Sequence, residues 1–244
     1  MSSVCRSNMR LLLLHFFATA ATASAFVLTP QYTWTKLILT HHWPTTFCGM
    51  EKCHSKIDTW TLHGLWPDNG MDCNSTWPFN VSLIEDLLPD MEKSWPDLIS
   101  PESTSFWKYE WYKHGTCAAK AESLNSQHKY FGKALELYHK VDLDSVLKKF
   151  DIIPSTKYYL FSHIQEIIDG FYGVNLKFQC VHPSKNAGYQ ILGQIEICFT
   201  ADFSVMHCER ESRAVNSSLR AEAKPGFSVC DPEVPVYYPP MTML

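Results

Sequence analysis

Apolar side chains near the start of the chain follow the spacing and composition of β-strands. Residues 34–43 and 59–66 are rich in β-branched and aromatic side chains, and each run is followed by a proline, Pro44 or Pro67. Runs of this kind are typical of strands. We expect the intervening segment 45–56 to be a loop.

Helical spacing of apolar residues dominates the middle of the chain. Ser82 and Glu85 have the spacing of an N-terminal capping box ahead of one helix. A further helix is expected to begin at 104 or 105, to carry residues 110–114 and to end at Gly115. The clearest helix is expected at 127–141, where apolar residues share one face. Shorter helices are expected at 144–150 and 162–171.

The pattern returns to strands after residue 173. Alternating or continuous apolar runs predict strands at 174–181, 190–200, 203–208, 227–230 and 234–238, and the polar segment 209–225 is expected to be a loop. Strands, then helices, then strands with short links are typical of α+β proteins. We therefore predict one α+β domain over 26–244, with a mainly antiparallel sheet packed against several helices and stapled by disulfides.

The N-terminus has the pattern of a secretory signal. Arg6 and Arg10 precede the leucine run 11–14, and small residues follow over 18–25. We expect residues 1–25 to be a signal peptide that is cleaved after Ala25. No later apolar run is long enough to predict a membrane span. The protein is therefore expected to be secreted, with the lysosome or the endoplasmic reticulum lumen as further destinations.

The cysteine count agrees with a secreted protein. The chain has nine cysteines, and loss of Cys5 with the signal leaves eight, an even number that indicates disulfides. Cys48 with Cys53 and Cys198 with Cys208 are close enough to close local loops, and the partners of the other four cysteines stay open at this point. A structural zinc site is the competing interpretation, but the chain contains no C-x-x-C pair.

Three sequons and the charge balance complete this picture. Asn74, Asn80 and Asn216 are candidate N-glycosylation sites. Without the signal the chain carries 19 basic and 25 acidic residues, a net charge of −6, which is not that of a protein that coats nucleic acid. Ten histidines remain, and protonation of all of them would change the net charge to +4. An acidic compartment would thus favour attraction of polyanions.

Two short stretches carry candidate chemistry. On a helix, Glu110, Lys113 and His114 would share a face, although such a group is also ordinary decoration of a solvated helix. His63 lies on the second expected strand, and a disulfide between Cys73 and Cys117 would bring it close to that face. Two facing histidines suit phosphodiester cleavage by a neighbouring hydroxyl, because one accepts a proton while the other donates one. A lysine nearby would stabilise the charged phosphorus.

At these residues the chain resembles a known family. HGLWP at 63–67 and EWYKHGTC at 110–117 are similar to the two active-site segments of the ribonuclease T2 family, in particular its animal secreted and lysosomal members. The resemblance covers nearly all of the chain after the signal. It implies metal-free endonucleolytic cleavage of single-stranded RNA through a 2′,3′-cyclic phosphate to a 3′-phosphate, with no cofactor. The two histidines, and the positive charge that the chain gains as histidines are protonated, predict an acidic pH optimum.

The resemblance also implies a role for each residue. His114 would be the general base and His63 the general acid, while Glu110 and Lys113 would stabilise the pentacoordinate phosphorus. Trp66 would stack on a base of the RNA, although core packing explains a tryptophan equally well. The family pairing implies four disulfides: Cys48–Cys53, Cys73–Cys117, Cys180–Cys230 and Cys198–Cys208. We expect a monomer that does not cut DNA.

Two departures from the family pattern leave alternatives open. Tyr109 stands where such members usually carry a phosphate-binding histidine, and His41 stands where a glutamine is usual. Tyr109 brings no positive charge, which keeps open a secreted binding or signalling protein with weak or no turnover. A zinc cluster of His41, His42, His63 and His114 is a third hypothesis, which their spacing does not favour.

Overall fold

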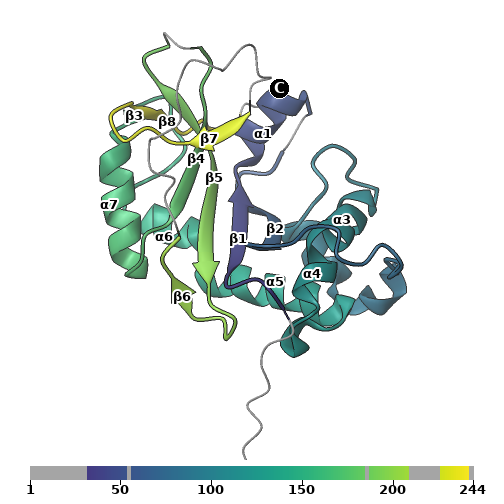
Figure 1. Ribbon diagram of the computed structural model, residues 1–244. Helices are drawn as coiled ribbons and strands as arrows, with labels where there is room; N and C mark the ends of the chain where they lie inside the picture. Colours follow the sequence, from purple (N-terminus) through teal and green to yellow (C-terminus); the bar gives the residue numbers. More distant parts are fainter. Residues whose placement is uncertain (1–31, 54–55, 185–186, 209–225, 242–244) are drawn as a thin grey trace, which may run out of the picture.

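The computed structural model describes residues 32–53, 56–184, 187–208 and 226–241 (Figure 1). The expected signal peptide at 1–25, the expected loop at 209–225 and the sequon at Asn216 lie outside these ranges. Among the helices of the described ranges, none combines the length and the apolar character needed to cross a bilayer.

The fold is built on one eight-stranded sheet. The strands are β1 (Leu37–His42), β2 (Thr61–Pro67), β3 (Tyr158–Tyr159), β4 (Lys177–Val181), β5 (Gln190–Phe199), β6 (Val205–Met206), β7 (Phe227–Val229) and β8 (Val236–Tyr237). The main path runs β2-β1-β5-β4-β7, β6 extends β5, and β8 joins β3 to β5. All pairs are antiparallel except β5 with β8. This confirms the predicted α+β domain with a mainly antiparallel sheet.

Helices lie near both ends of the strand order β2-β1-β5-β4-β7. They are α1 (Pro44–Glu51), α2 (Leu88–Ser94), α3 (Ser105–Glu110), α4 (Thr116–Ala118), α5 (Gln127–Val141), α6 (Leu143–Lys149) and α7 (Phe161–Tyr172). Short 3-10 turns are η1 (Val81–Leu83), η2 (Glu85–Leu87) and η4 (Glu122–Leu124), and η3 (Trp111–Gly115) is π-helical. In Figure 1, α3 and α4 lie beyond β2, whereas α7 lies beyond β4 at the opposite end.

Among the described residues the longest helix is α5, which has the predicted limits and buries the predicted apolar face. Tyr130, Phe131 and Ala134 are fully buried in the core. The helix begins after Ser126, whose side chain accepts the backbone N–H of Lys129 and satisfies one of the free donors of the first turn. Burial of this face is what holds a helix of ordinary propensity in place.

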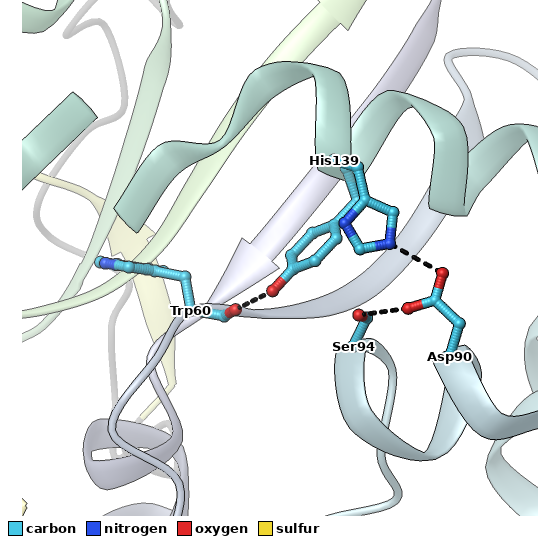
Figure 2. Close-up of polar contacts among 5 residues, drawn as sticks. Trp60, Asp90, Ser94 and His139 are labelled. Atoms are coloured by element: carbon cyan, nitrogen blue, oxygen red, sulfur yellow. Dashed lines mark hydrogen bonds and ion pairs between the residues drawn. The ribbon is translucent and has the colours of Figure 1, made fainter. Parts of the chain in front are cut away.

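Polar contacts fasten α5 to its neighbours (Figure 2). Asp90 of α2 accepts the Ser94 hydroxyl through one carboxylate oxygen and lies 2.7 Å from His139 Nε2 of α5 through the other. The Tyr138 hydroxyl donates to the backbone carbonyl of Trp60, just before β2. These contacts tie α5 to the strand that carries HGLWP.

Three local expectations were wrong. The segment 45–56 is not simply a loop, because Pro44 starts α1 at a position where its missing N–H has no helical partner to lose. Ser82 is not a cap: it lies inside η1, and its backbone N–H is accepted by the Asn80 side chain. Gly115 does not end its helix, because its φ of −58° is right-handed helical and the chain continues into α4.

The eight described cysteines form four disulfides. They are Cys48–Cys53, Cys73–Cys117, Cys180–Cys230 and Cys198–Cys208, the same pairs that the family resemblance implies. The second joins the segment after β2 to the start of α4 and so closes a loop across 44 positions. It holds the two chemistry-bearing stretches together.

Candidate active site

A β-bulge aims His63 out of the sheet. In the β1–β2 pair, Thr40 faces Gly64 and His41 faces Leu62, so that His63 is an extra residue without a partner on β1. Bulges bend a strand locally and re-aim side chains, often next to active sites. Its neighbours Leu62 and Gly64 are buried, whereas the His63 side chain is partly exposed.

A π-helical turn sets the second stretch. Glu110 ends α3, and Lys113 and His114 lie in η3. The π-helical turn packs closely at Gly115, against the fully buried Trp111 ring. A Cβ at Gly115 would overlap that ring. Single π-turns inside helices are frequent at functional sites. Glu110 and His114 are both buried, so the plain solvated helix face does not apply to them.

The Trp66 indole joins the two stretches. Its Nε1 donates to Glu110 Oε2 at 2.8 Å. Its ring stacks on His114, with centroids 5.1 Å apart, and meets His63 edge-on with centroids 4.8 Å apart. Gly64 is required beneath it, because a Cβ there would overlap both Trp66 Nε1 and Glu110 Oε2. One indole therefore contacts two histidines and a carboxyl group at once.

Lys113 lies beside Tyr109 at the edge of this cluster. Its Nζ donates to the Tyr109 hydroxyl and stands 4.8 Å from the centroid of that ring. The Tyr109 side chain is half exposed. The residue that departs from the family pattern thus contacts the ammonium group that is expected to bind phosphate.

Comparisons with known proteins decide the family. A sequence model described as the Ribonuclease T2 family matches residues 34–208, well over half of the chain. The chain belongs to the ribonuclease T2 family. It is an endoribonuclease of this family.

Relatives and solved structures agree with this membership. Ribonuclease T2 of Danio rerio is 57% identical over 230 residues, which cover 93% of this chain and 95% of the relative. Ribonuclease T2 of Homo sapiens is 44% identical, covering 86% of each chain. The crystal structure of human RNase T2 matches with a TM-score of 0.74 over 86% of this chain and 100% of that one, at 45% identity. RNase NT in complex with 5′-AMP matches with a TM-score of 0.66 at 25% identity, over 85% of this chain and 99% of that one.

Burial changes the protonation of Glu110 in this ribonuclease T2 family protein. Removal from water raises the pKa of its carboxyl group to about 8, although the Trp66 hydrogen bond and the Lys113 charge oppose this shift. Its Oε1 has no hydrogen-bond partner within the described residues. At neutral and acid pH Glu110 is therefore a neutral acid that can donate a hydrogen bond.

The two histidines differ in proton affinity. Burial, and then the charge of Lys113, lower the pKa of His63 to about 4. Burial, Lys113 and His63 together lower the pKa of His114 to about 3. Both rings are neutral near pH 7, and when acid is added His63 is the first to take a proton.

Two residues to which sequence reasoning assigned no role in RNA cleavage lie next to His63. Gln194 of β5 is buried, and its Nε2 lies 2.7 Å from His63 Nδ1. His42 of β1 is also buried, with its ring centroid 5.2 Å from that of His63. Gln194 is one of three polar side chains on β5, with Gln190 and Glu196, and the sequence does not tell which group it faces.

His41 does not join the site. Its ring stacks on Tyr138 of α5, with centroids 5.5 Å apart, because successive side chains of a strand point to opposite faces. It therefore does not replace a phosphate-binding charge. Within the described ranges, no group of three or more His, Cys, Asp or Glu side chains is arranged to hold a metal ion, so the four-histidine zinc hypothesis finds no support.

Proposed function

We propose that this endoribonuclease cleaves single-stranded RNA by metal-free transesterification, with His114 as the general base and His63 as the general acid. The observation that carries the proposal is the contact of one indole, that of Trp66, with His63, Glu110 and His114 together. This packing supports the proposal, because two imidazoles held beside one indole could accept one proton and donate another at a scissile phosphodiester.

The chemistry balances in two steps. His114 takes the proton of the 2′-hydroxyl, the 2′-oxygen bonds to phosphorus, and the bond to the 5′-oxygen breaks as His63 gives that oxygen a proton. This leaves a 2′,3′-cyclic phosphate. In the second step His63 takes a proton from water as the water oxygen bonds to phosphorus, and the bond from phosphorus to the 2′-oxygen breaks as His114 returns its proton to that oxygen. The product ends in a 3′-phosphate.

Glu110 and Lys113 stabilise the crowded phosphorus in this proposal. A neutral Glu110 donates a hydrogen bond to a phosphate oxygen, whereas an ionised one would repel the phosphate. The Lys113 ammonium supplies the positive charge, and its own pKa is raised, first by the hydrogen bond to Tyr109. Preorganised donors of this kind act on charge that develops during the reaction.

An acidic pH optimum follows from the two histidines. The rate needs His63 protonated and His114 neutral, a state that is most populated between their pKa values of about 4 and about 3. A bound phosphate favours the imidazolium form of His63 and so raises its pKa, which extends the active pH range upward. The pH profile is therefore bell-shaped with an acid maximum.

Substrate class and compartment belong to the same proposal. DNA is not cut, because it lacks the 2′-hydroxyl nucleophile. The part of Trp66 that His114 leaves uncovered would contact an RNA base. We propose a monomer that carries a cleaved signal at 1–25, is secreted or delivered to the lysosome, and bears glycans at its sequons. Among these, Asn74 and Asn80 are exposed.

The test compares wild type with His114→Ala on single-stranded RNA at acid pH with a chelator present. Removal of the base should reduce turnover by roughly two to four orders of magnitude, while RNA affinity and fold stay nearly unchanged. Equal, slow cleavage by both proteins would refute the proposal. It would favour the second candidate, a binding or signalling protein without turnover, for which Tyr109 in place of a cation is the supporting observation.

A further inference from the structure

We infer that Gln194 is the positioning residue for His63, fixing which ring nitrogen exchanges the proton; this rests on the proposed role of His63 as general acid. Gln194 comes from β5, the central strand, and its side chain is 3% exposed. Its Nε2 lies 2.7 Å from His63 Nδ1, within hydrogen-bond distance. Gln194 lies outside the two family segments at 63–67 and 110–117.

In the free enzyme, where the amide nitrogen of Gln194 faces Nδ1, the contact favours one tautomer. A neutral imidazole has one nitrogen that donates and one that accepts. With the amide N–H on Nδ1, neutral His63 accepts there and carries its proton on Nε2. The backbone carbonyl of His63 also accepts Trp95 Nε1 at 2.9 Å, so the residue is held at both its main chain and its ring. The ring therefore cannot turn over to exchange its two nitrogens without losing the Gln194 contact.

An amide suits both protonation states of the ring. Imidazolium donates from both nitrogens, and Gln194 can then turn its side-chain oxygen toward Nδ1. When Nε2 gives its proton to the leaving oxygen, Nδ1–H stays hydrogen-bonded to the Gln194 side-chain oxygen, so that between the two steps the ring is the opposite neutral tautomer from that of the free enzyme. Water can then return a proton to Nε2 in the second step. Through the whole cycle, Nε2 is the nitrogen that exchanges protons, and no charged group is needed on the buried side.

The other groups around His63 do not perform this task. His42 of β1 faces the ring at a centroid distance of 5.2 Å, beyond a hydrogen bond. Lys113 and His114 of the π-turn act on His63 through charge, and they disfavour its protonation when they are positive. Within the described part of the chain, Gln194 is the group that hydrogen-bonds a ring nitrogen of His63.

The test uses two substitutions and one matched control. Gln194→Met keeps the side-chain length but removes the hydrogen bond, and Gln194→Glu replaces the amide with a carboxylate. Gln190→Met is the control: Gln190 is equally buried on β5, but its amide donates to the backbone carbonyls of Asp231 and Val234, away from His63. It should lower stability without moving the pH profile.

The kinetic readout is the pH dependence of kcat and KM on a short RNA. We expect Gln194→Met to lower kcat by roughly tenfold to a hundredfold, as when the hydrogen-bond partner of a metal-bound histidine is removed, with KM nearly unchanged. Gln194→Glu should move the limb that reports His63 protonation to higher pH, because a carboxylate favours imidazolium. An unmoved limb in both variants would overturn the inference.

A second readout does not depend on turnover. In protein labelled with 15N-histidine, two-bond nitrogen–proton couplings tell which nitrogen of His63 carries the proton. Wild type should show one neutral tautomer, with the proton on Nε2, and Gln194→Met should show a mixture. A mixture in wild type would overturn the inference even if every variant misfolds. Full turnover in His63→Ala would instead refute the proposed function and leave this spectroscopic result standing.

Discussion

The buried His41 makes a prediction about acid stability that is separate from catalysis. Its side chain is fully buried against Tyr138. Burial lowers its pKa from 6.5 to about 4, and a contact with the Ile195 backbone only partly opposes the shift. The folded state thus binds this proton less well than the unfolded chain. The His41 contribution to stability is therefore fully present above pH 6.5 and is lost as the pH falls toward 4.

The magnitude follows from the two pKa values. One pKa unit corresponds to about 1.4 kcal/mol, so the whole shift amounts to about 3 kcal/mol of unfolding free energy below pH 4. At about pH 5 the loss through His41 is already about 2 kcal/mol. His41→Gln removes the titrating group and fits a position where the family usually has glutamine. The substitution should flatten the acid side of the stability profile by these amounts.

Urea unfolding at several pH values between about 8 and about 4, followed by tryptophan fluorescence with the disulfides intact, measures this effect. The difference between variant and wild type at the highest pH reports the altered packing, and its change with pH reports the proton. His163→Gln, at an exposed position of α7, is the control and should run parallel to wild type. Parallel profiles for His41→Gln and wild type would refute the assigned titration.

The remaining predictions concern catalysis. The double variant of His63→Ala and His114→Ala should lose little more turnover than either single variant, because the two groups act in one concerted step; rates on single-stranded RNA test this, and additive losses would contradict it. Tyr109→His should keep or raise kcat/KM at acid pH by adding a cation beside the phosphate, and a clear decrease would argue against that role. Gly64→Ala should reduce turnover sharply by displacing Trp66 and Glu110, whereas Gly49→Ala, where a Cβ meets no atom within 4 Å, should not.

Sequence patterns predicted the architecture well where periodicity decides it. The limits of α5 were predicted correctly, because its apolar residues recur at helical spacing along the whole helix and form one buried face. Tertiary context overrode weaker signals: Pro44 ended a strand as expected, but it also began a helix. The two-residue strand β3 has too few residues to carry any period, and it exists because it pairs with β8.

The candidate site shows a different limit. Sequence motifs selected His63, Glu110 and His114, and the structure brings them around Trp66. The bulge at His63 was not predictable, because it is an insertion relative to the partner strand β1 and not a feature of local composition. The contact of Gln194 with His63 depends in the same way on the register of three neighbouring strands.

Burial of the site has opposing consequences. It favours the neutral rings of His63 and His114, one of which the proposed reaction needs as a base, but together with the buried His41 and His42 it also makes the folded state bind fewer protons in acid. These four histidines therefore weaken the fold in the pH range where the proposed reaction is fastest. The Cys73–Cys117 disulfide acts against this loss, because closing a loop across 44 positions contributes about 4 kcal/mol in the chain-entropy model. A cross-link placed between the two active-site stretches stabilises the fold at every pH, which a salt bridge of titrating groups would not do.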